Sequence, residues 1–316
     1  MWQAVEEQLK NQLPFVVYRK PKEEEVNAIF QDNNVLNRVS DFNKAGFVFA
    51  SFNTENVPIL LKADKRKKIL ITESEAVLDF DNSSIEPKKG HDDYIDLLEN
   101  SINDIESGKF HKVVLSRVLE VENKTSPIKL LQRILSIYKN AFCYLWYHPK
   151  VGMWLGATPE ILLQSQNTLF TTMSLAGTMK YEESSKPVWG NKELDEQVLV
   201  TDYILNALKG KVSDIEKSDT ETVRAGELLH LRTKITGHLK EDGLHEIIRA
   251  LHPTPAICGF PKQTALNFIL NNEGYNREFY GGFLGELNLD AEKSTTLYVN
   301  LRCMQQVGDK MKIYVG

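Results

Sequence analysis

The sequence predicts an α/β fold of the α+β kind, with antiparallel β-sheets and flanking helices in a single domain that spans residues 1–316. Three observations lead to this prediction. Several strand-like runs follow one another directly, which favours antiparallel pairing over a strict strand–helix–strand repeat. Runs with helical periodicity separate the groups of strands. No linker divides the 316 residues, and 42% of them are hydrophobic, which is enough for one large core.

The N-terminal part is predicted to form a short helix and four strands, followed by a loop and a second helix. The first helix covers residues 2–13, and the apolar runs after it are FVVYRKP, GFVFASF, VPILL and KKILITE. Residues 75–89 are polar and contain Pro87, so they are predicted to form a loop. The second helix is predicted in HDDYIDLLENSINDIESG, because apolar residues recur there at steps of three and four and Gly108 ends it.

From residue 110 onward, groups of strands alternate with helices. Strands are predicted in KVVLSRVLEV, AFCYLWY, GMWLGATPEILL, TLFTTMSLAGT, LLHLRTKITGHL and KMKIYV, and a hairpin in FYGGFLGELNL with STTLYVNLRCMQQV. Helices are predicted in PIKLLQRILSIY, NKELDEQVLVTDYILNAL, LHEIIRAL and KQTALNFILNN. Because strands come in consecutive groups, we expect antiparallel sheets throughout this part.

The overall charge and the cysteines narrow the class of protein. The net charge is −5, which argues against nucleic acid or an anionic membrane as a partner. The N-terminus MWQAVEEQLKNQL lacks the apolar stretch of a signal peptide, and no run approaches the length of a membrane span. The three cysteines show no CxxC spacing, which fits a reducing compartment. We therefore expect a cytoplasmic protein and favour a monomer.

Two charged residues lie inside apolar, strand-like runs, where charges are rarely placed without a reason. They are Lys112 in FHKVVLSRV and Glu160 in WLGATPEILL. A base and an acid in two neighbouring strands could act on opposite faces of a small ring, where water adds at one carbon and hydroxide leaves another. The base must keep a neutral amine and the acid must stay protonated. Taken singly, Lys112 also fits a lysine that reaches solvent from a strand end, and Glu160 a turn carboxylate.

Other polar residues suggest where an anion and a metal ion could bind. Glu193 and Glu196 are three positions apart and share one helix face, which fits oxygen ligation of Mg²⁺, although acidic residues at a helix start also simply favour the helix dipole. A lone strand histidine such as His230 is more often a satisfied core group. Arg302 cannot lose its charge and requires a carboxylate or phosphate partner. The run YGG at residues 280–282 brings backbone amides close to a ligand or marks a bulge.

Eight runs, taken in order, resemble the chorismate-utilising enzymes, and among them the isochorismate synthases most closely. The runs are KVVLSR, GATPEILL, SLAGT, NKELDEQ, LLHLRTKITG, LHPTPAICGFP, REFYGGFLGE and LYVNLRC, which cover residues from about 110 to 303. The resemblance implies two large antiparallel sheets stacked face to face with helices outside, and a deep central cleft that binds chorismate with Mg²⁺. Residues 1–100 match weakly, as expected for the variable N-terminal part of the family, and residues 110–316 correspond to the catalytic core.

The resemblance also implies roles for individual residues. Lys112 is the implied base that activates water for attack at ring C2, and Glu160 the implied acid that protonates the leaving C4 hydroxyl. Glu196 resembles a Mg²⁺ ligand and Glu193 a supporting acidic residue, so that the metal ion would hold the ring carboxylate. Arg302 would pair with a substrate carboxylate. The full set of implied substrate contacts is His230, Thr254, Tyr280 and Arg302.

Two positions distinguish the branches of the family. Relatives that transfer an amine to make anthranilate usually carry glutamine where Lys112 stands, and an amide is no base, so Lys112 favours water as the nucleophile. Aminodeoxychorismate synthases place a nucleophilic lysine where this chain has Ala176. The implied activity is therefore isochorismate synthase, an isomerase of menaquinone or siderophore biosynthesis. The near alternative is salicylate synthase, which shares these residues and adds pyruvate elimination.

The end of the chain departs from the family pattern. The sequence ends at KMKIYVG, where the family continues with a glycine-rich segment and then with paired glutamates and a lysine. Those parts supply backbone amides for the substrate and the second Mg²⁺ carboxylate. We therefore expect a catalytic core truncated at its C-terminus, which is poorly active or inactive when the sequence is taken literally. This leads to a further hypothesis, a chorismate-binding protein without catalysis.

Overall fold

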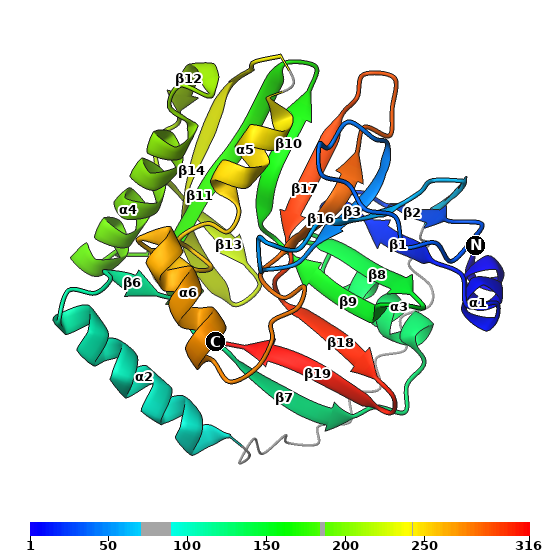
Figure 1. Cartoon of the computed structure of the whole chain (residues 1–316), viewed down its shortest axis with the longest axis horizontal. Coiled ribbons are helices and arrows are strands. Elements are labelled where there is room, and N and C mark those ends of the chain that lie inside the picture. Colours follow the sequence, from blue (N-terminus) through cyan, green and yellow to red (C-terminus); the bar gives the residue numbers. More distant parts are fainter. Residues whose placement is uncertain (71–89, 184–186, 242) are drawn as a thin grey trace.

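Two antiparallel sheets, packed face to face, form the centre of the molecule (Figure 1). The computed structural model describes residues 1–70, 90–183, 187–241 and 243–316. Within these residues, the strand order of the first sheet is β5 (Lys65–Leu70), β2 (Glu25–Phe30), β1 (Phe15–Arg19), β8 (Phe142–His148), β9 (Gly152–Thr158), β18 (Cys303–Val307), β19 (Lys310–Val315) and β7 (Arg117–Glu122). The predicted α+β architecture of stacked antiparallel sheets is confirmed.

The second sheet is built from the middle of the chain and from β3 and β4. Its strand order is β12 (Val212–Lys217), β14 (Leu228–Leu239), β11 (Leu169–Lys180), β10 (Ile161–Gln166), β17 (Thr295–Val299), β16 (Phe283–Leu287), β3 (Gly46–Ala50) and β4 (Ile59–Leu61), and β13 (Glu221–Ala225) also pairs with β14. A separate two-stranded sheet consists of β6 (Lys112–Val113) and β15 (Gly259–Phe260).

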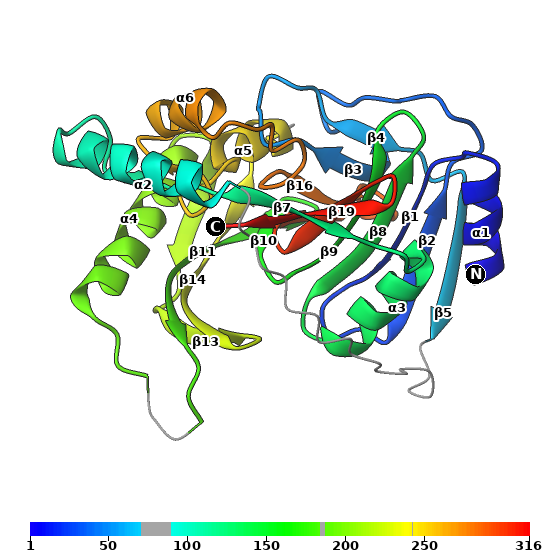
Figure 2. The same cartoon turned by 90° about the horizontal axis from the view of Figure 1, so that it is seen from below.

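Helices cover the outer faces of both sheets (Figure 2). The helices in the described residues are α1 (Trp2–Lys10), α2 (His91–Glu106), α3 (Pro127–Ile137), α4 (Asn191–Leu208), α5 (Leu244–Leu251) and α6 (Lys262–Asn272). Sequence explains α3 locally, because the Ser126 hydroxyl accepts a hydrogen bond from the Lys129 amide at 3.4 Å and Pro127 stands at the first helical position. Among the described helices, none combines the length and the apolar character that crossing a membrane requires.

The core has three layers, one between the sheets and one on each outer face. Aromatic rings fill the middle layer. The ring centres of Phe142 and Tyr298 are 4.2 Å apart in a stacked arrangement, and those of Phe49 and Trp146 are 4.9 Å apart. Burial of such side chains stabilises the fold by roughly 1.5–3 kcal/mol each. The helices α1 and α3 pack on the first sheet, and α4, α5 and α6 pack on the second. The two sheets are therefore held at a fixed spacing by ring packing.

Besides the links from β2 to β3 and from β4 to β5, the chain passes from one sheet to the other at two adjacent crossings. The first crossing links β9 to β10 through Pro159 and Glu160, and the second links β17 to β18 through residues 300–302. The Ala157 amide donates to the Arg302 carbonyl at 3.1 Å, and the Val299 amide donates to the Glu160 carbonyl at 3.0 Å. These two bonds join the crossings, so that their side chains are brought to one place in the molecule.

Three runs that were each predicted to form one continuous strand are divided into two strands, so these predictions are wrong. The run KVVLSRVLEV divides into β6 and β7, because residues 114–116 bond to other segments instead of continuing a ladder. The run GMWLGATPEILL divides into β9 and β10 at Pro159, which has no amide hydrogen to donate. The run STTLYVNLRCMQQV divides into β17 and β18, so only its first half forms the predicted hairpin with β16.

Other differences are smaller. The strands β2, β12, β13 and β15 were not predicted. β12 and β13 are short polar edge strands that carry little apolar signal, and β15 has only two residues. The predicted loop at residues 75–89 lies outside the described residues, as does the end of the run KKILITE. The predicted helices correspond to α1 through α6, with bounds that differ by a few residues.

Candidate active site

Lys112 lies in the two-stranded sheet of β6 and β15 and contacts an acidic residue of α4. The pairing of β6 with β15 sets Lys112 opposite Phe260. Its Nζ forms an ion pair and hydrogen bond with Oε1 of Glu196, although the two residues are 84 positions apart. The side chains are 19% and 32% exposed, so the pair lies at the boundary between protein and solvent.

Glu160 lies at the first crossing and is buried. Burial raises the pKa of Glu160 to about 7, while the positive charges of Lys112 and Arg302 act to lower it. Both cations are therefore within electrostatic reach of this carboxyl group. A carboxyl with such a pKa keeps a substantial protonated fraction at neutral pH and can donate the proton to a leaving group.

Arg302 lies at the second crossing, directly before β18. The prediction that it lies within a strand is wrong, because its φ of +49° turns the chain and interrupts the extended backbone. Its Nη1 comes within 3.9 Å of the point where a Cβ on Gly226 would stand, in the turn between β13 and β14. The guanidinium group therefore extends toward the edge of the second sheet, over the region that His230 occupies.

His230 lies in β14 and is held by the neighbouring strand β11. Its Nδ1 is 3.2 Å from the Gly177 carbonyl and 3.2 Å from the Thr178 hydroxyl. Burial lowers the pKa of His230, the Gly177 carbonyl raises it, and the charges of Arg302 and Glu196 lower and raise it respectively. The ring is therefore favoured in its neutral form, and it lies within electrostatic reach of Arg302 and Glu196.

Glu193 stands in the first turn of α4, close to a bulge in β11. The bulge is at Gly177, which has a φ of +67°, and a Cβ added there would stand 3.2 Å from the Cβ of Glu193. Only glycine allows this close approach without strain. The bulge therefore lets the first two turns of α4, which carry Glu193 and Glu196, lie against the sheet beside His230.

Thr254 and Tyr280 lie in segments next to this group. Thr254 is buried, and its hydroxyl has no hydrogen-bond partner among the described residues. Tyr280 is also buried and stacks on Tyr314 with ring centres 4.8 Å apart. An unpaired buried hydroxyl is costly unless a ligand or water satisfies it. The orphan hydroxyl of Thr254 is therefore suited to a ligand contact, whereas the ring of Tyr280 is packed within the core.

Sequence reasoning placed Lys112 and Glu160 in neighbouring strands, which is wrong. The strand β6 belongs to the separate two-stranded sheet, and Glu160 follows β9 at the crossing. Electrostatic and hydrogen-bond contacts nevertheless link five of the predicted site residues, which are Lys112, Glu160, Glu196, His230 and Arg302. The roles assigned to these residues stay predictions. The pairing of Lys112 with Glu196 had no sequence signal, because it joins a strand to a helix far along the chain.

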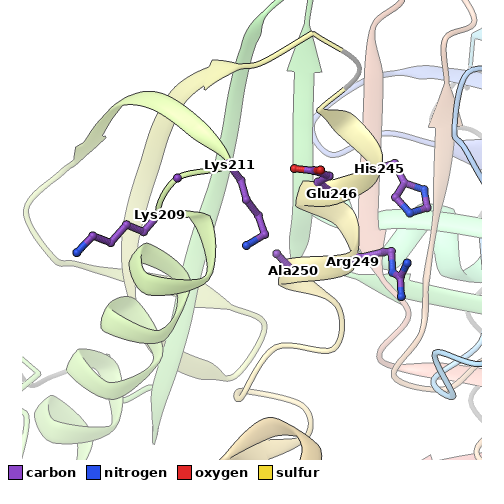
Figure 3. A pocket seen from close by; sticks show the side chains of 7 residues that line it. Lys209, Lys211, His245, Glu246, Arg249 and Ala250 are labelled. Atoms are coloured by element: carbon purple, nitrogen blue, oxygen red, sulfur yellow. The ribbon is translucent and has the colours of Figure 1, made fainter.

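An open, basic groove lies apart from this group of residues (Figure 3). It measures about 780 Å³ and is lined by residues from the end of α4 and from α5. The lining residues are Lys209, Gly210, Lys211, His245, Glu246, Arg249 and Ala250. None of the predicted site residues is among them, so the groove is distinct from the candidate active site.

Comparison with curated proteins shows similarity to isochorismate synthases. Isochorismate synthase EntC of Escherichia coli (strain K12) is 28% identical over 219 residues, which are 65% of this chain and 55% of that protein. Isochorismate synthase DhbC of Bacillus subtilis (strain 168) is 27% identical over 272 residues, which are 76% of this chain and 67% of that protein. The chain thus spans little more than half the length of several curated relatives that it matches.

Solved structures show the same fold. DhbC from Bacillus anthracis superposes with a TM-score of 0.81 at 21% identity, over 100% of this chain and 92% of that chain. MenF, the menaquinone-specific isochorismate synthase of Escherichia coli, gives 0.77 at 20% identity, over 96% of this chain and 82% of that chain. Anthranilate synthase component I from Streptococcus pneumoniae TIGR4 gives 0.69 at 17% identity, over 96% and 84%. At these identities the likeness establishes the fold alone.

The family match covers most of the chain. A family model described as chorismate binding enzyme matches residues 51–316, which include all of the predicted site residues and part of the N-terminal hundred. The resemblance carried by the eight ordered runs is therefore confirmed at the level of the family, and the chain belongs to the chorismate binding enzymes.

Proposed function

We propose that this protein is an isochorismate synthase, which isomerises chorismate to isochorismate by adding water at ring C2 and releasing the C4 hydroxyl. The observation that supports this most strongly is the buried carboxyl of Glu160, with a pKa of about 7, within electrostatic reach of Lys112 and Arg302. Loss of hydroxide from C4 needs a proton donor, and a carboxyl group with this pKa can supply the proton at neutral pH.

Lys112 is proposed as the base that activates water. A base must be uncharged when it accepts the proton, and in this structure Lys112 is paired with Glu196. The ion pair therefore has to open, and Lys112 has to lose its proton, before catalysis.

The remaining predicted residues are proposed to bind chorismate. The guanidinium of Arg302 can hold a substrate carboxylate through two parallel hydrogen bonds. The neutral ring of His230 and the orphan hydroxyl of Thr254 offer hydrogen bonds of a kind that fixes orientation without adding charge. For Tyr280 we propose an indirect contribution, because its ring is stacked within the core.

Mg²⁺ is the metal ion that the family resemblance implies, and the acidic residues of α4 are suited to a cation. Glu196 already holds one cation, the Lys112 ammonium group, and Glu193 lies one helical turn away. No group of three or more metal-ligating side chains occurs in the part of the chain that the structure describes. Glu196 and Glu193 would therefore supply at most two ligands, with substrate and water completing the shell, as is usual for Mg²⁺. When bound, Mg²⁺ would offset the charge of the ring carboxylate.

Product analysis separates the candidate functions. Any turnover of chorismate by purified protein with Mg²⁺, even if slow, is expected to give isochorismate and no pyruvate, as measured by chromatographic separation of the reaction mixture. Salicylate with an equal amount of pyruvate would replace the proposal by salicylate synthase. Heat of chorismate binding in calorimetry, without any product at excess Mg²⁺, would identify a binding protein instead. A control without protein accounts for the spontaneous decay of chorismate.

The metal site can be tested by a single substitution in α4. The change Glu196→Gln is expected to raise the Mg²⁺ concentration for half-maximal activity about tenfold or more, since 1.4 kcal/mol of lost binding is a factor of ten. The matched control is Asp195→Asn, which removes the same charge one position away on an exposed part of the helix. Equal Mg²⁺ dependence of the two variants would remove Glu196 from the metal site.

A further inference from the structure

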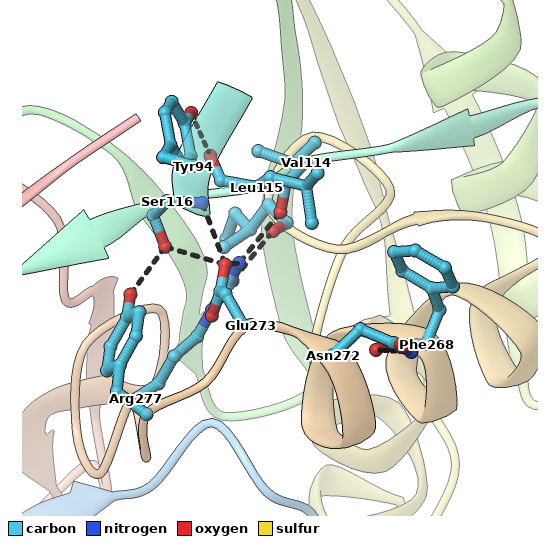
Figure 4. Close-up of polar contacts among 10 residues, drawn as sticks. Tyr94, Val114, Leu115, Ser116, Phe268, Asn272, Glu273 and Arg277 are labelled. Atoms are coloured by element: carbon cyan, nitrogen blue, oxygen red, sulfur yellow. Dashed lines mark hydrogen bonds and ion pairs between the residues drawn. The ribbon is translucent and has the colours of Figure 1, made fainter. Parts of the chain in front are cut away.

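We propose that Glu273 and Arg277 are a positioning pair that fixes the Lys112 strand against the Thr254 segment; the proposal rests on the function proposed above. The two residues form an ion pair just after α6, with side chains that are 0% and 2% exposed respectively (Figure 4). Neither residue has a role in the chemistry described so far. Two opposite charges so deeply buried require a complete set of hydrogen bonds.

Glu273 ties α6 to the segment between β6 and β7. One carboxylate oxygen, Oε1, accepts hydrogen bonds from the Ser116 amide at 2.7 Å and from the Ser116 hydroxyl at 2.9 Å. The same hydroxyl lies 2.6 Å from the Tyr275 hydroxyl. Ser116, in the interruption of the predicted strand KVVLSRVLEV, is thus anchored by a carboxylate instead of by a sheet partner.

Arg277 ties the same segment to the loop that follows α5. Its Nη2 donates to the Val114 carbonyl at 2.7 Å, and its Nη1 donates to the Ile257 carbonyl at 3.3 Å. Its Nε donates to Glu273 Oε2 at 2.6 Å. The guanidinium carbon also lies 4.4 Å from the ring centre of Phe52, which gives the cation a favourable face to stack on. One planar group therefore fixes two backbone segments at once.

Three predicted site residues lie within a short distance along the chain from these anchors. Lys112 is two positions before Val114, and Thr254 is three positions before Ile257. The Tyr280 amide donates to the Arg277 carbonyl at 2.8 Å. The amide of Val114 also donates to the Cys258 carbonyl at 3.0 Å, so the two anchored segments are bonded to each other as well. Any loosening of the ion pair would move Lys112 relative to Thr254.

The geometry of the Glu273–Arg277 pair indicates that it positions the neighbouring backbone segments more than it stabilises the fold. A buried ion pair is often no more stabilising than apolar side chains of similar size, because both charges lose their hydration. Apolar side chains, however, could not hold the Val114 and Ile257 carbonyls at fixed distances. A misplacement of about 1 Å in a catalytic group can lower the rate about 10²-fold. The directional fork of Arg277 is therefore the property that an apolar replacement cannot reproduce.

The test replaces both charges together, so that neither is left buried without a partner. In the double variant Glu273→Met with Arg277→Met, kcat is expected to fall about 10²-fold, by a larger factor than any rise in KM. Arg277→Lys keeps the positive charge but loses the planar set of guanidinium donors. It is expected to lower kcat more than it raises KM, by a smaller factor than in the double variant. Amide hydrogen exchange is expected to accelerate in residues 112–116 and 257–259 and to stay unchanged in α4.

A matched control separates positioning from loss of stability. Arg19 is also buried and donates to two backbone carbonyls, those of Leu135 and Tyr138, both at 2.6 Å, on the far side of the first sheet. Arg19→Met is expected to lower the melting temperature and to leave kcat per folded molecule unchanged. If Arg19→Met lowered kcat per folded molecule by as much as the double variant does, the proposal would be overturned.

The outcomes of the two proposals are distinguishable. If wild-type protein does not turn over chorismate, the proposed function fails, and hydrogen exchange alone decides whether the pair holds residues 112–116. Unchanged exchange there in the folded double variant would overturn the positioning role, whatever the activity. If the double variant does not fold, Arg277→Lys is compared with Arg19→Met by the same measurements, and equal kcat values for the two would overturn the proposal.

Discussion

Replacing Lys112 with alanine is expected to lower kcat about 10²–10⁴-fold, which is the usual contribution of a positioned general base. Chorismate should still bind, because the proposed base acts on water in the transition state and does not hold the substrate. Calorimetry gives the binding constant, and product formation at saturating chorismate gives kcat. The loss is predicted to appear in kcat and kcat/KM alike, with KM almost unchanged.

The matched control is Lys109→Ala. Lys109 lies three positions before Lys112, is 63% exposed and pairs with Asp104 at the end of α2. This substitution removes the same charge from the same stretch of chain, and its activity is expected to equal that of the wild type. Full turnover in Lys112→Ala would exclude Lys112 as the base. A loss in Lys109→Ala of the same size would attribute the effect to net charge.

Replacing Glu160 with glutamine is the second change with a large expected effect. An amide of similar size cannot deliver a proton, so kcat is expected to fall about 10²–10⁴-fold. In the wild type, activity should decline as the pH rises through about 7, because the raised pKa of Glu160 makes the protonated acid scarce above that value. The pH profile of kcat/KM measures this limb. If the residual activity of the Glu160→Gln variant declines over the same pH range, the decline belongs to a group other than Glu160.

The same pKa makes stability depend on pH, with a definite sign. Between pH 4.5, the ordinary pKa, and about 7, the folded protein keeps the Glu160 proton and the unfolded chain loses it, so the free energy of unfolding falls as the pH rises. The contribution is about 3 kcal/mol over this range. His252 acts in the opposite direction, because burial lowers its pKa to about 3. The difference between wild type and Glu160→Gln in urea unfolding, measured at pH 5 and pH 8, cancels the His252 contribution.

The sequence predicted the architecture well because each layer carries a periodic apolar signal. Helices such as α4 and α6 and long strands such as β11 and β14 have enough residues for the pattern to stand out. The strands β12 and β13 lie at an edge and are mostly polar, so hydrophobic patterning could not find them. The splitting of GMWLGATPEILL was not predicted, because two apolar stretches on either side of Pro159 do not reveal that they belong to different sheets.

The site was predicted from ordered motifs, and its geometry depends on tertiary contacts. Lys112 and Glu160 looked unusual because charges rarely occur in apolar runs, but no spacing rule connects Lys112 with Glu196. The pair Glu273 and Arg277 was missed for a different reason. Acidic and basic residues four apart, in a stretch as polar as NNEGYNRE, usually indicate a solvated surface, and only tertiary packing buries them here.

The two crossings link the proposed chemistry of Glu160 and Arg302 to the aromatic layer between the sheets. Glu160 and Arg302 each lie in a short segment that connects the two sheets. If one sheet slid past the other, the distance between the Glu160 carboxyl and the Arg302 guanidinium would change. The rings of Phe49 and Trp146 act as the spacer that resists such a slide. Substitutions of the aromatic residues between the sheets are therefore expected to change the reaction rate, although none of these residues contacts the substrate in the proposed site.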